Sequence, residues 1–386
     1  MRILIVGAGI AGLSLAHELD RQGIDDVVVL ERAESFAHVG AGIHLGPWGM
    51  AVLDANGVGA AVRRSGLSYP SRAYYDRRGE FLGRIDFDDL AERHAGPTGA
   101  FIHRAALHEC LAEAVPDAWL RTGVEMTSLV DTGDGVRVET SNHGAFEADL
   151  LVGCDGLHSF VRAQLLGVRE QPLGKRSLRA IVDAPEDLAE VEIYRGAGST
   201  IGLARIDGAG RAYAWTHVPA GPPGIDPLPD DPAAVLADLL SAYGAPRMHD
   251  LADRLSHATV VAADLFEVTV PTWWRGRVVL AGDAAHAMSP SAGSGGAMAF
   301  EDAAVLARQL AGVTSGTASL EEALDRYARA RLPRVEGIRA QARYTDYDGQ
   351  ITSPGLCDIR DERFARLLAR PEAFAAEVTG ALDLDR

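Results

Sequence analysis

The hydrophobic and polar positions at the beginning of the chain predict a strand, a helix and a second strand. Residues 2–7 (RILIVG) form a continuous apolar run, which is typical of a parallel strand buried on both faces. Residues 10–22 carry one apolar stripe at helical spacing, and residues 26–31 (DVVVLE) return to an apolar run. We therefore expect the chain to open with a βαβ unit.

Strand patterns interrupt the α/β arrangement further along. A hairpin is expected over 71–86, strand-rich sequence over 119–153, and several strands over 176–218. The other expected elements are helices at about 104–115, at about 233–243 and from about 294 onward, a loop over 219–232, and buried strands at 149–153 and 277–283. This order indicates a discontinuous α/β domain with a second, β-rich lobe inserted into it.

Composition and charge narrow the classes of partner. The 386 residues include 54 Asp and Glu against 37 Lys and Arg, so the net charge is −17 and a nucleic-acid partner is not expected. No stretch approaches the ~18 apolar residues of a membrane span. The three cysteines show neither a disulfide framework nor metal-ligand spacing, which favours a cytoplasmic protein without a metal site.

A glycine-rich motif, GAGIAG at residues 7–12, follows the first predicted strand. In a GxGxxG motif, Gly7 allows a tight turn, Gly9 lets the backbone approach a pyrophosphate, and Gly12 permits close helix–strand packing. An ordinary glycine-rich turn is the alternative. Glu31, however, ends the second strand, where an acceptor for a ribose hydroxyl is expected. The pattern predicts a dinucleotide site, and the charge of Glu31 disfavours NADP there.

A second motif, Gly282-Asp283-Ala284-Ala285-His286, follows the apolar run at 277–281. Pro290 and the glycines of residues 293–296 (GSGG) come next and open a predicted helix. Asp283 is positioned to accept hydrogen bonds from sugar-like hydroxyls, and the helix start presents N–H groups to an electron-rich ligand atom. A strand–turn–helix connection without a ligand is the alternative interpretation.

A third motif, CDGLHSFVR at residues 154–162, also comes directly after a predicted buried strand. Its Asp155 and Arg162 are spaced to lie near each other across the first two turns of a helix. A structural ion pair between these two residues would explain the motif without any ligand.

These motifs resemble the FAD-dependent monooxygenases of the aromatic hydroxylase type, the group A flavoprotein monooxygenases with the p-hydroxybenzoate hydroxylase fold. The resemblance covers roughly residues 1–340 and rests on five segments in order: GAGIAG at 7–12, Glu31-Arg32, IHRAAL at 102–107, CDGLHSFVR at 154–162 and GDAAHAMSPSAGSGG at 282–296. It implies an α/β fold, with a Rossmann-like FAD-binding domain (GR2-type), an inserted β-rich substrate domain and C-terminal helices. The expected division is 1–70, 98–170 and 270–340 for the FAD-binding domain, 71–97 and 171–269 for the substrate domain, and 341–386 for a C-terminal helical segment.

The resemblance also implies which residues bind FAD. The first motif, with Glu31 and Arg32, would hold the ADP half, Arg104 the pyrophosphate or ribityl region, and Asp283 the ribityl chain. Asp155 belongs to a motif linked to FAD and to transient NAD(P)H binding, and the segment around Pro290 would lie against the isoalloxazine. The complete expected set is Gly7, Gly9, Ile10, Ala11, Gly12, Glu31, Arg32, Arg104, Asp155, Asp283, Pro290, Gly293, Gly295, Gly296 and Ala297.

Three positions depart from the family pattern. Ser294 and Ala297 stand where members often carry Gln and Asn, and Trp48 replaces a frequent Asn in the segment GAGIHLGPWGM at 40–50. These changes weaken any carry-over of substrate specificity. A separate nicotinamide-binding motif is absent from the sequence, in agreement with the transient use of NAD(P)H in this family.

Candidate substrate-contacting residues come from the strand RAYAWTHV at 211–218. Period-two alternation places Tyr213, Trp215 and His217 on one face, which would contact either the substrate or only the core. The other candidates are His44, Trp48 and Pro290. For Arg195 and Arg205 a solvated strand edge is expected, with contact to a substrate carboxylate as the alternative.

The resemblance implies an NAD(P)H- and O2-dependent monooxygenase in which a flavin C4a-hydroperoxide transfers one oxygen atom to a small aromatic, heteroaromatic or natural-product substrate. Hydroxylation is the expected reaction, with epoxidation and Baeyer–Villiger insertion as alternatives on the same scaffold. A flavin-dependent reductase or dehydrogenase would carry the same motifs, and a non-redox flavin-binding protein is a third possibility. A monomer or a homodimer is expected.

Overall fold

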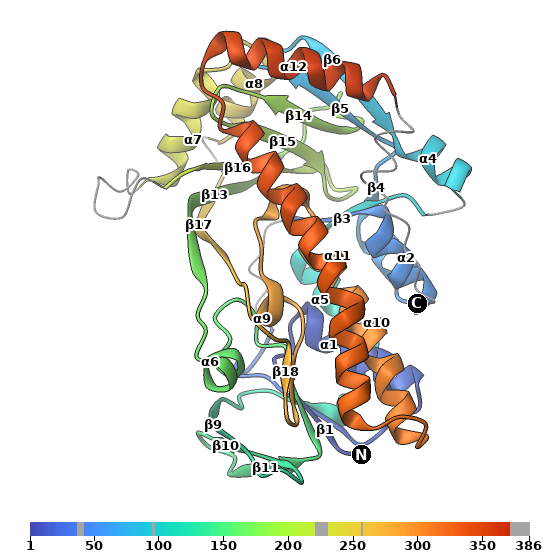
Figure 1. Cartoon of the computed structure of the whole chain (residues 1–386). Helices are drawn as coiled ribbons and strands as arrows, with labels where there is room; N and C mark the ends of the chain where they lie inside the picture. Colours follow the sequence, from blue (N-terminus) through green and yellow to red (C-terminus); the bar gives the residue numbers. More distant parts are fainter. Residues whose placement is uncertain (37–41, 95–96, 221–230, 256–257, 371–386) are drawn as a thin grey trace.

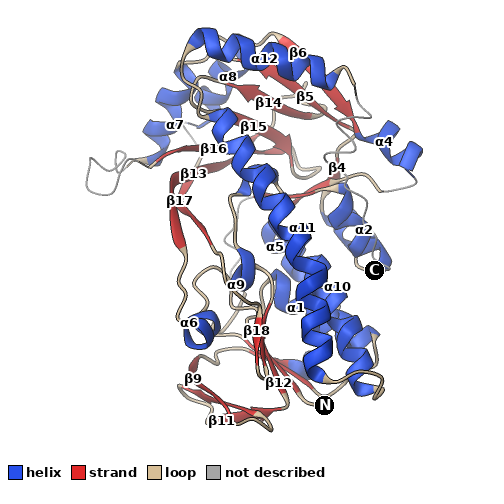
Figure 2. Cartoon of the chain, viewed as in Figure 1, coloured by secondary structure: helices blue, strands red, loops and turns tan. Residues whose placement is uncertain are grey.

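The chain folds as the expected α/β protein, with two large sheets and two small ones (Figures 1 and 2). The computed structural model describes residues 1–36, 42–94, 97–220, 231–255 and 258–370. The greater part of the expected loop at 219–232, the first two residues of the segment 40–50, and residues 371–386 lie outside the described residues.

A six-stranded sheet forms the base of the first half, in the order β18-β19-β12-β1-β2-β8. All neighbouring strands are parallel except β18, which pairs antiparallel with β19. The strands are β1 (Ile3–Val6), β2 (Val27–Leu30), β8 (Leu120–Arg121), β12 (Leu150–Gly153), β18 (Trp274–Arg275) and β19 (Val278–Leu280). All residues of β1, β12 and β19 are buried, because helices and loops cover both faces, as the continuous apolar runs predicted.

Helices and short 3₁₀ turns pack around this sheet. Leu13, Leu15 and Leu19 of the first helix are fully buried, and Phe300 and Leu306 of the tenth helix belong to the same core cluster. The elements of this half are α1 (Ile10–Arg21), α2 (Pro47–Ala55), α3 (Gly59–Ser65), α5 (Arg104–Ala112), η1 (Asp117–Trp119), α6 (Phe160–Leu166), α9 (Asp283–His286), η2 (Pro290–Ala292) and α10 (Gly295–Thr314).

A seven-stranded sheet forms the second half, in the order β17-β13-β16-β15-β14-β5-β6. Its strands are β5 (Ser71–Asp76), β6 (Phe81–Asp86), β13 (Gln171–Asp183), β14 (Val191–Arg195), β15 (Thr200–Arg205), β16 (Arg211–Pro219) and β17 (Val260–Glu267). Only β14 and β5 pair in parallel. Helices α7 (Pro232–Ser241) and α8 (Pro246–Leu255) cover one face and share a core cluster with it, while the opposite face carries a second core cluster.

Two three-stranded sheets complete the fold. One contains β9 (Met126–Asp131), β10 (Val136–Thr140) and β11 (Ala145–Ala148), whose first hairpin turns at the predicted residues 133–135. The other contains β3 (Gly42–Leu45), β4 (Leu67–Ser68) and β7 (Ala100–His103). Helix α4 (Phe87–His94) follows β6. Phe101 on β7 and Trp215 on β16 have ring centroids 5.6 Å apart, so this small sheet contacts the seven-stranded one.

Helix α11 (Leu320–Gly349) extends along much of the molecule and reaches both halves (Figure 1). A capping box at Ser319 and Glu322 fixes its N-terminus. The helix is continuous through residue 341, where the last segment of the expected division begins. That boundary therefore falls within a helix and coincides with no break in the backbone.

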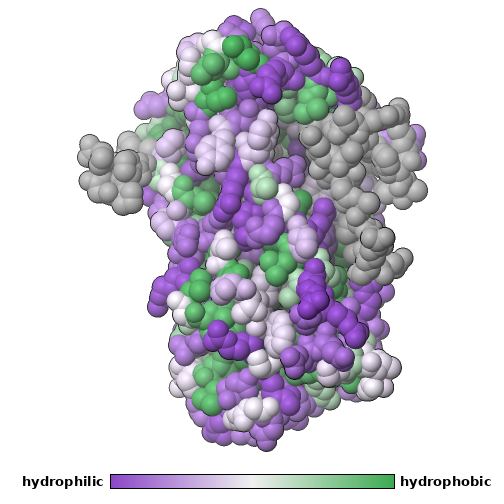
Figure 3. All heavy atoms as spheres, viewed as in Figure 1, coloured by the Kyte–Doolittle hydropathy of each residue, from purple (hydrophilic) through white to green (hydrophobic). Residues whose placement is uncertain are grey.

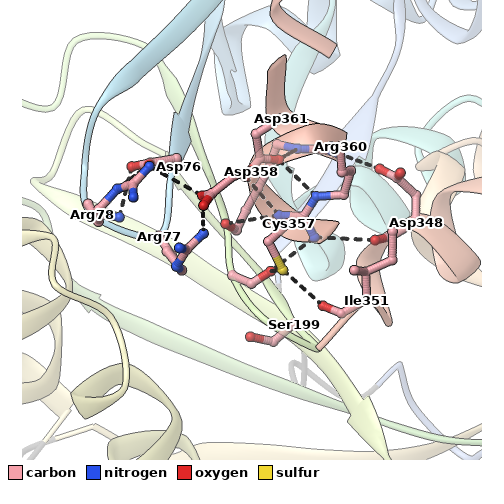
Figure 4. Close-up of polar contacts among 12 residues, drawn as sticks. Asp76, Arg77, Arg78, Ser199, Asp348, Ile351, Cys357, Asp358, Arg360 and Asp361 are labelled. Carbon is pink, nitrogen blue, oxygen red and sulfur yellow. Dashed lines mark hydrogen bonds and ion pairs between the residues drawn. The ribbon is translucent and has the colours of Figure 1, made fainter. Parts of the chain in front are cut away.

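Helix α12 (Pro354–Leu368) lies across the seven-stranded sheet and is held there by buried charges (Figure 4). Arg195 of β14 donates to Asp361 at 2.9 Å and also pairs with Asp348, while Arg360 donates to Asp361 at 2.8 Å. The expectation of a solvated edge for Arg195 is wrong, because β14 lies between two strands and α12 covers it. Arg205, on β15, donates to the carbonyl oxygens of Leu188 and Pro185.

On the face drawn in Figure 3, hydrophobic residues gather in separate small patches among hydrophilic ones. Across the part of the chain that the structure describes, every helix is too short or too polar to cross a membrane.

Candidate active site

All three sequence motifs and Glu31 lie at one edge of the six-stranded sheet. Gly7 follows β1, Glu31 follows β2, Asp155 follows β12, and Asp283 follows β19. Because these strands are parallel, their carboxyl ends meet at the same edge, and β1 lies at the centre of the row. A ligand of an open α/β sheet binds at such an edge, where the connections diverge to opposite sides.

Glycines allow the backbones at this edge to approach one another more closely than other residues would. A Cβ atom on Gly12 would lie 1.9 Å from the carbonyl oxygen of Gly7, and one on Gly7 would lie 2.5 Å from the carbonyl oxygen of Cys154. A Cβ on Gly282 would lie 2.7 Å from the Cβ of Ala11. The first motif therefore packs directly against the two motifs that follow β12 and β19.

Gly9 differs from these glycines, since a Cβ atom added to it would meet no protein atom within 4 Å. It is the N-cap of α1 and has no side chain to accept a hydrogen bond from the first N–H groups of the helix. The unpaired N–H groups and the positive end of the helix dipole favour an anion at this position. The space beside Gly9 fits a pyrophosphate.

Glu31 is held by the backbone of two neighbouring loops. Its carboxylate accepts from the N–H of Ala8 and from the N–H of Ala33, each at 2.9 Å. These bonds fix its side chain at the end of β2, beside the glycine turn. Arg32, Ala33 and Glu34 are exposed at the same place.

The loop after β19 is positioned by a buried ionic network beneath it. Asp302 of α10 accepts from the Gly282 N–H at 2.9 Å, contacts His286 Nε2 at 2.6 Å and accepts from Arg331 Nε at 2.7 Å. Arg331 also pairs with Glu301. His286 thus orders the turn. Asp283 itself is exposed at the first turn of α9.

Asp155 and Arg162 do not form the ion pair that their spacing suggested. Asp155 accepts from Ser159 Oγ at 2.5 Å and from the Val161 N–H at 3.0 Å, so it caps α6. Burial raises the pKa of this carboxyl group. The ion pair of Arg162 is with Glu170, at 3.0 Å, because the chain after α6 brings that residue back to the helix.

Five aromatic side chains contact one another between the two halves, and we call them the aromatic cluster: His44, Tyr69, Phe101, Tyr213 and Trp215. Neighbouring ring centroids lie 5.0 to 5.6 Å apart. Tyr213 and Trp215 are stacked on β16, as period-two alternation predicted. Tyr69 and Phe101 were missed, because β4 and β7 are too short to leave a periodic signal.

His44 joins the aromatic cluster to the segment after η2. Its Nδ1 lies 3.3 Å from the carbonyl oxygen of Gly293, and its Nε2 contacts the hydroxyl of Tyr69 and lies 3.2 Å from Nη2 of Arg72. Burial, and secondarily the charge of Arg72, lowers the pKa of His44 to about 3. The neutral imidazole thus donates from Nδ1 and accepts at Nε2.

His217 connects the same segment to α11. Its Nδ1 lies 3.1 Å from Ser291 Oγ, Ser291 donates to Asp346 at 2.5 Å, and Asp346 pairs with Lys175 at 2.8 Å. Burial lowers the pKa of His217 to about 4. Burial also raises the pKa of Tyr213 to about 12. Both histidines beside the η2 segment are therefore neutral near pH 7.

The remaining expected residues take three positions. Pro290, Gly293, Gly295 and Gly296 keep accessible surface around η2 and the start of α10, near the two histidines. Trp48 and Ala297 are buried in the core of the first half, where Gly49 lies against Ala297, so Trp48 is separate from the aromatic cluster. Arg104 is exposed at the start of α5, and its charge acts on Tyr213.

The site therefore has two connected parts. Its glycine edge, with Glu31, Gly9 and Asp283, fits a dinucleotide such as FAD. Its η2 segment and α10 N-terminus, where Ser294 provides no side-chain cap, lie between that edge and the aromatic cluster. In the described part of the chain no group of His, Cys, Asp and Glu has the arrangement of a metal site.

Comparisons with known proteins identify the class. The family model described as "FAD binding domain" matches residues 1–342. Aurachin C monooxygenase/isomerase of Stigmatella aurantiaca is 33% identical over 376 residues, covering 96% of this chain and 94% of that protein. For 6-hydroxynicotinate 3-monooxygenase of Pseudomonas fluorescens the identity is also 33%, over 87% of this chain and 90% of that protein.

Among solved structures, Klebsiella pneumoniae HpxO complexed with FAD and uric acid has a TM-score of 0.83 at 26% identity, with 97% of each chain covered. These matches define a flavoprotein with the aromatic hydroxylase fold. The chain belongs to the FAD-binding domain family, and its relatives there are FAD-dependent monooxygenases. Its cofactor is FAD.

Replacing Gly9 by alanine separates cofactor binding from folding. Because the added methyl group meets no protein atom and the backbone is extended there, Gly9→Ala should leave the free energy of unfolding within about 1 kcal/mol. The methyl group would occupy the space for the pyrophosphate, so the Kd for FAD should rise at least about tenfold. Fluorescence titration of the apoprotein measures this, with Gly208→Ala, another position with open space, as the control. Equal FAD affinity in Gly9→Ala and the control would contradict this placement of the pyrophosphate.

The lowered pKa of His44 predicts an acid-sensitive fold. Between about pH 6.5 and pH 3 the unfolded chain binds a proton that folded His44 does not, so stability is full above this window and falls as the pH decreases through it. The contribution is up to about 1.4 kcal/mol per pH unit. His44→Gln should show a shallower decline in unfolding free energy between pH 7 and pH 4. Denaturant titrations measure it, with the exposed His143→Gln as the control; parallel declines in wild type and His44→Gln would refute the assignment.

Proposed function

We propose that this chain hydroxylates a small aromatic or heteroaromatic compound, using O2 and NADH or NADPH. The observation that supports this most directly is the contact between the expected flavin segment and the aromatic cluster. Gly293 meets His44, and Ser291 meets His217, so a ring placed on that segment would face stacked aromatic side chains. Bound FAD, reduced by NAD(P)H, supplies the activated oxygen for this chemistry.

The proposed cofactor contacts follow from the two parts of the site. Residues of the glycine turn (Gly7, Gly9, Ile10, Ala11 and Gly12), together with Glu31 and Arg32, hold the ADP half. Asp283 holds the ribityl chain, and Arg104 contacts the region between them. The η2 segment and the α10 N-terminus lie along the isoalloxazine, and their N–H groups favour negative charge there. Asp155 supports this arrangement indirectly, since it caps α6 beside the glycine turn.

The protein residues contribute position, low polarity and neutral hydrogen-bonding groups. Tyr213 and Trp215 offer apolar rings against which an aromatic substrate packs. His44 and His217 are neutral at pH 7, so each provides a hydrogen bond without adding a charge. A site walled by aromatic side chains also excludes water, which oxygen transfer from a flavin requires.

Relatives support a ring-shaped substrate. One is named a 6-hydroxynicotinate 3-monooxygenase, and HpxO was solved with uric acid, so both are associated with small planar ring compounds. Epoxidation and Baeyer–Villiger insertion remain compatible with the same arrangement, whereas a reductase or dehydrogenase would not need O2. We further propose that the protein is cytoplasmic, because its three cysteines are buried free thiols. We also propose that it is a monomer or a homodimer.

Coupled turnover tests the proposal. The FAD-loaded protein should oxidise NADH or NADPH faster when an aromatic substrate is present, and should consume one O2 for each product formed. Asp283→Ala should lose most of its bound flavin, while its flavin-free form should unfold at the temperature of flavin-free wild type, because Asp283 is exposed and its side chain forms no hydrogen bond with the described residues. Asp20→Ala, an exposed change on α1, serves as the control. Turnover that is insensitive to O2 would indicate a dehydrogenase, and full flavin occupancy in Asp283→Ala would remove its ribityl role.

A further inference from the structure

Arg72 of β5 is a deeply placed cation whose recorded partners are all uncharged. Its Nη2 lies 3.2 Å from His44 Nε2, and its guanidinium carbon lies 5.5 Å from the ring centroid of Phe87. The other two groups that act on its pKa are the phenols of Tyr69 and Tyr74. Among the described residues, no Asp or Glu forms an ion pair with Arg72, and its buried Nε has no hydrogen-bond partner.

Other arginines at the same sheet show how unusual this is. Arg195, on the neighbouring β14, pairs with both Asp348 and Asp361. Arg84 of β6 pairs with Glu190, and Arg247 of α8 pairs with Glu192 and Asp187. Among the described residues, carboxylates thus pair with the arginines around Arg72 but not with Arg72 itself.

His44 connects Arg72 to the η2 segment. His44 contacts Arg72 through Nε2 and the carbonyl of Gly293 through Nδ1, so a single imidazole separates the guanidinium from the residues proposed to lie along the isoalloxazine. His44, Arg72 and Trp215 all keep some accessible surface. These three side chains are therefore partly accessible beside the segment that is proposed to lie along the isoalloxazine.

A buried cation without a counter-charge lowers the stability of the fold, so it is retained where a ligand supplies the missing charge. A guanidinium presents its N–H groups in a planar fork that matches a carboxylate. We propose that Arg72 binds a carboxylate of the substrate, so that the enzyme acts on an aromatic acid whose ring lies on the aromatic cluster. This inference rests on the proposed function and names the substrate class for that site.

Arg179 of β13 is the second guanidinium on this face with a buried, unpartnered Nε. It lies opposite Trp215 in the sheet register and acts on Tyr213 and His217. Asp346, paired with Lys175, is close enough to His217 to act on it as well, so a carboxylate is already present at that end. Arg72 is therefore the stronger candidate for the substrate anion.

Benzoate and benzamide distinguish the charge from the ring, because they have the same shape and differ in charge. Each is titrated into the FAD-loaded protein, and binding is followed by the change in flavin absorbance. Wild type should bind benzoate at least about tenfold more tightly than benzamide, as expected for hydrogen bonds to a charged group. Arg72→Met should bind both with similar affinity, and Arg72→Lys should retain part of the preference.

Thermal unfolding without ligand provides the second readout. Arg72→Met should unfold at the same temperature as wild type or a higher one, because it removes an unpaired buried charge. Arg195→Met, the matched control, should unfold at a lower temperature, since it leaves Asp348 and Asp361 without this partner. Destabilisation of Arg72→Met equal to that of Arg195→Met would indicate a structural role for Arg72 and overturn the inference.

Three further outcomes separate this inference from the proposed function. If wild type holds FAD and shows substrate-stimulated NAD(P)H oxidation but binds benzoate no better than benzamide, only the substrate class is wrong. If Arg72→Met keeps the benzoate preference while its flavin reduction potential shifts, Arg72 serves the reduced flavin instead of the substrate, and the inference also fails. Absence of FAD binding in wild type would remove the proposed function itself.

Discussion

The close approach of three backbone turns at one sheet edge is the constraint on which the rest of this structure depends. The turn after β1 touches the ends of β12 and β19 with no room for a side chain at Gly7, Gly12 or Gly282. This packing leaves the N–H groups of α1 facing outward beside Gly9, where an anionic cofactor fits. In the proposed arrangement the cofactor extends from Glu31 past Gly9 toward Asp283.

The buried network of Asp302, His286 and Arg331 extends this constraint to the second half of the molecule. Asp302 holds the Gly282 turn, and Arg331 ties it to α11, the helix that reaches both large sheets. The far end of α11 carries Asp346 and Asp348, which hold Ser291 and Arg195. One helix thereby sets the distance between the η2 segment and the seven-stranded sheet that faces it.

Sequence reasoning found the parts of the site that depend on backbone geometry. Glycine spacing and apolar runs report turns and buried parallel strands directly, so the GAGIAG turn, Glu31 and the Asp283 loop were located correctly at the strand ends. Tyr213, Trp215 and His217 also share a face, because alternation along β16 is a local property. What was missed depends on pairing between distant segments. Tyr69, Phe101 and Arg72 come together only because β4, β7 and β5 are brought beside β3 and β14. The partner of Arg162 is another example, since Glu170 is set by the path of the chain after α6.

We propose that the chain uses FAD to insert one atom of O2 into an aromatic ring. Turnover under ¹⁸O2 with NADH or NADPH and a panel of aromatic acids, followed by mass spectrometry of the products, tests it most directly. We expect one ¹⁸O atom in each molecule of ring-hydroxylated product, and none when the label is in the water. Label arriving from water, or NAD(P)H oxidation that yields only hydrogen peroxide with every acid in the panel, would contradict it.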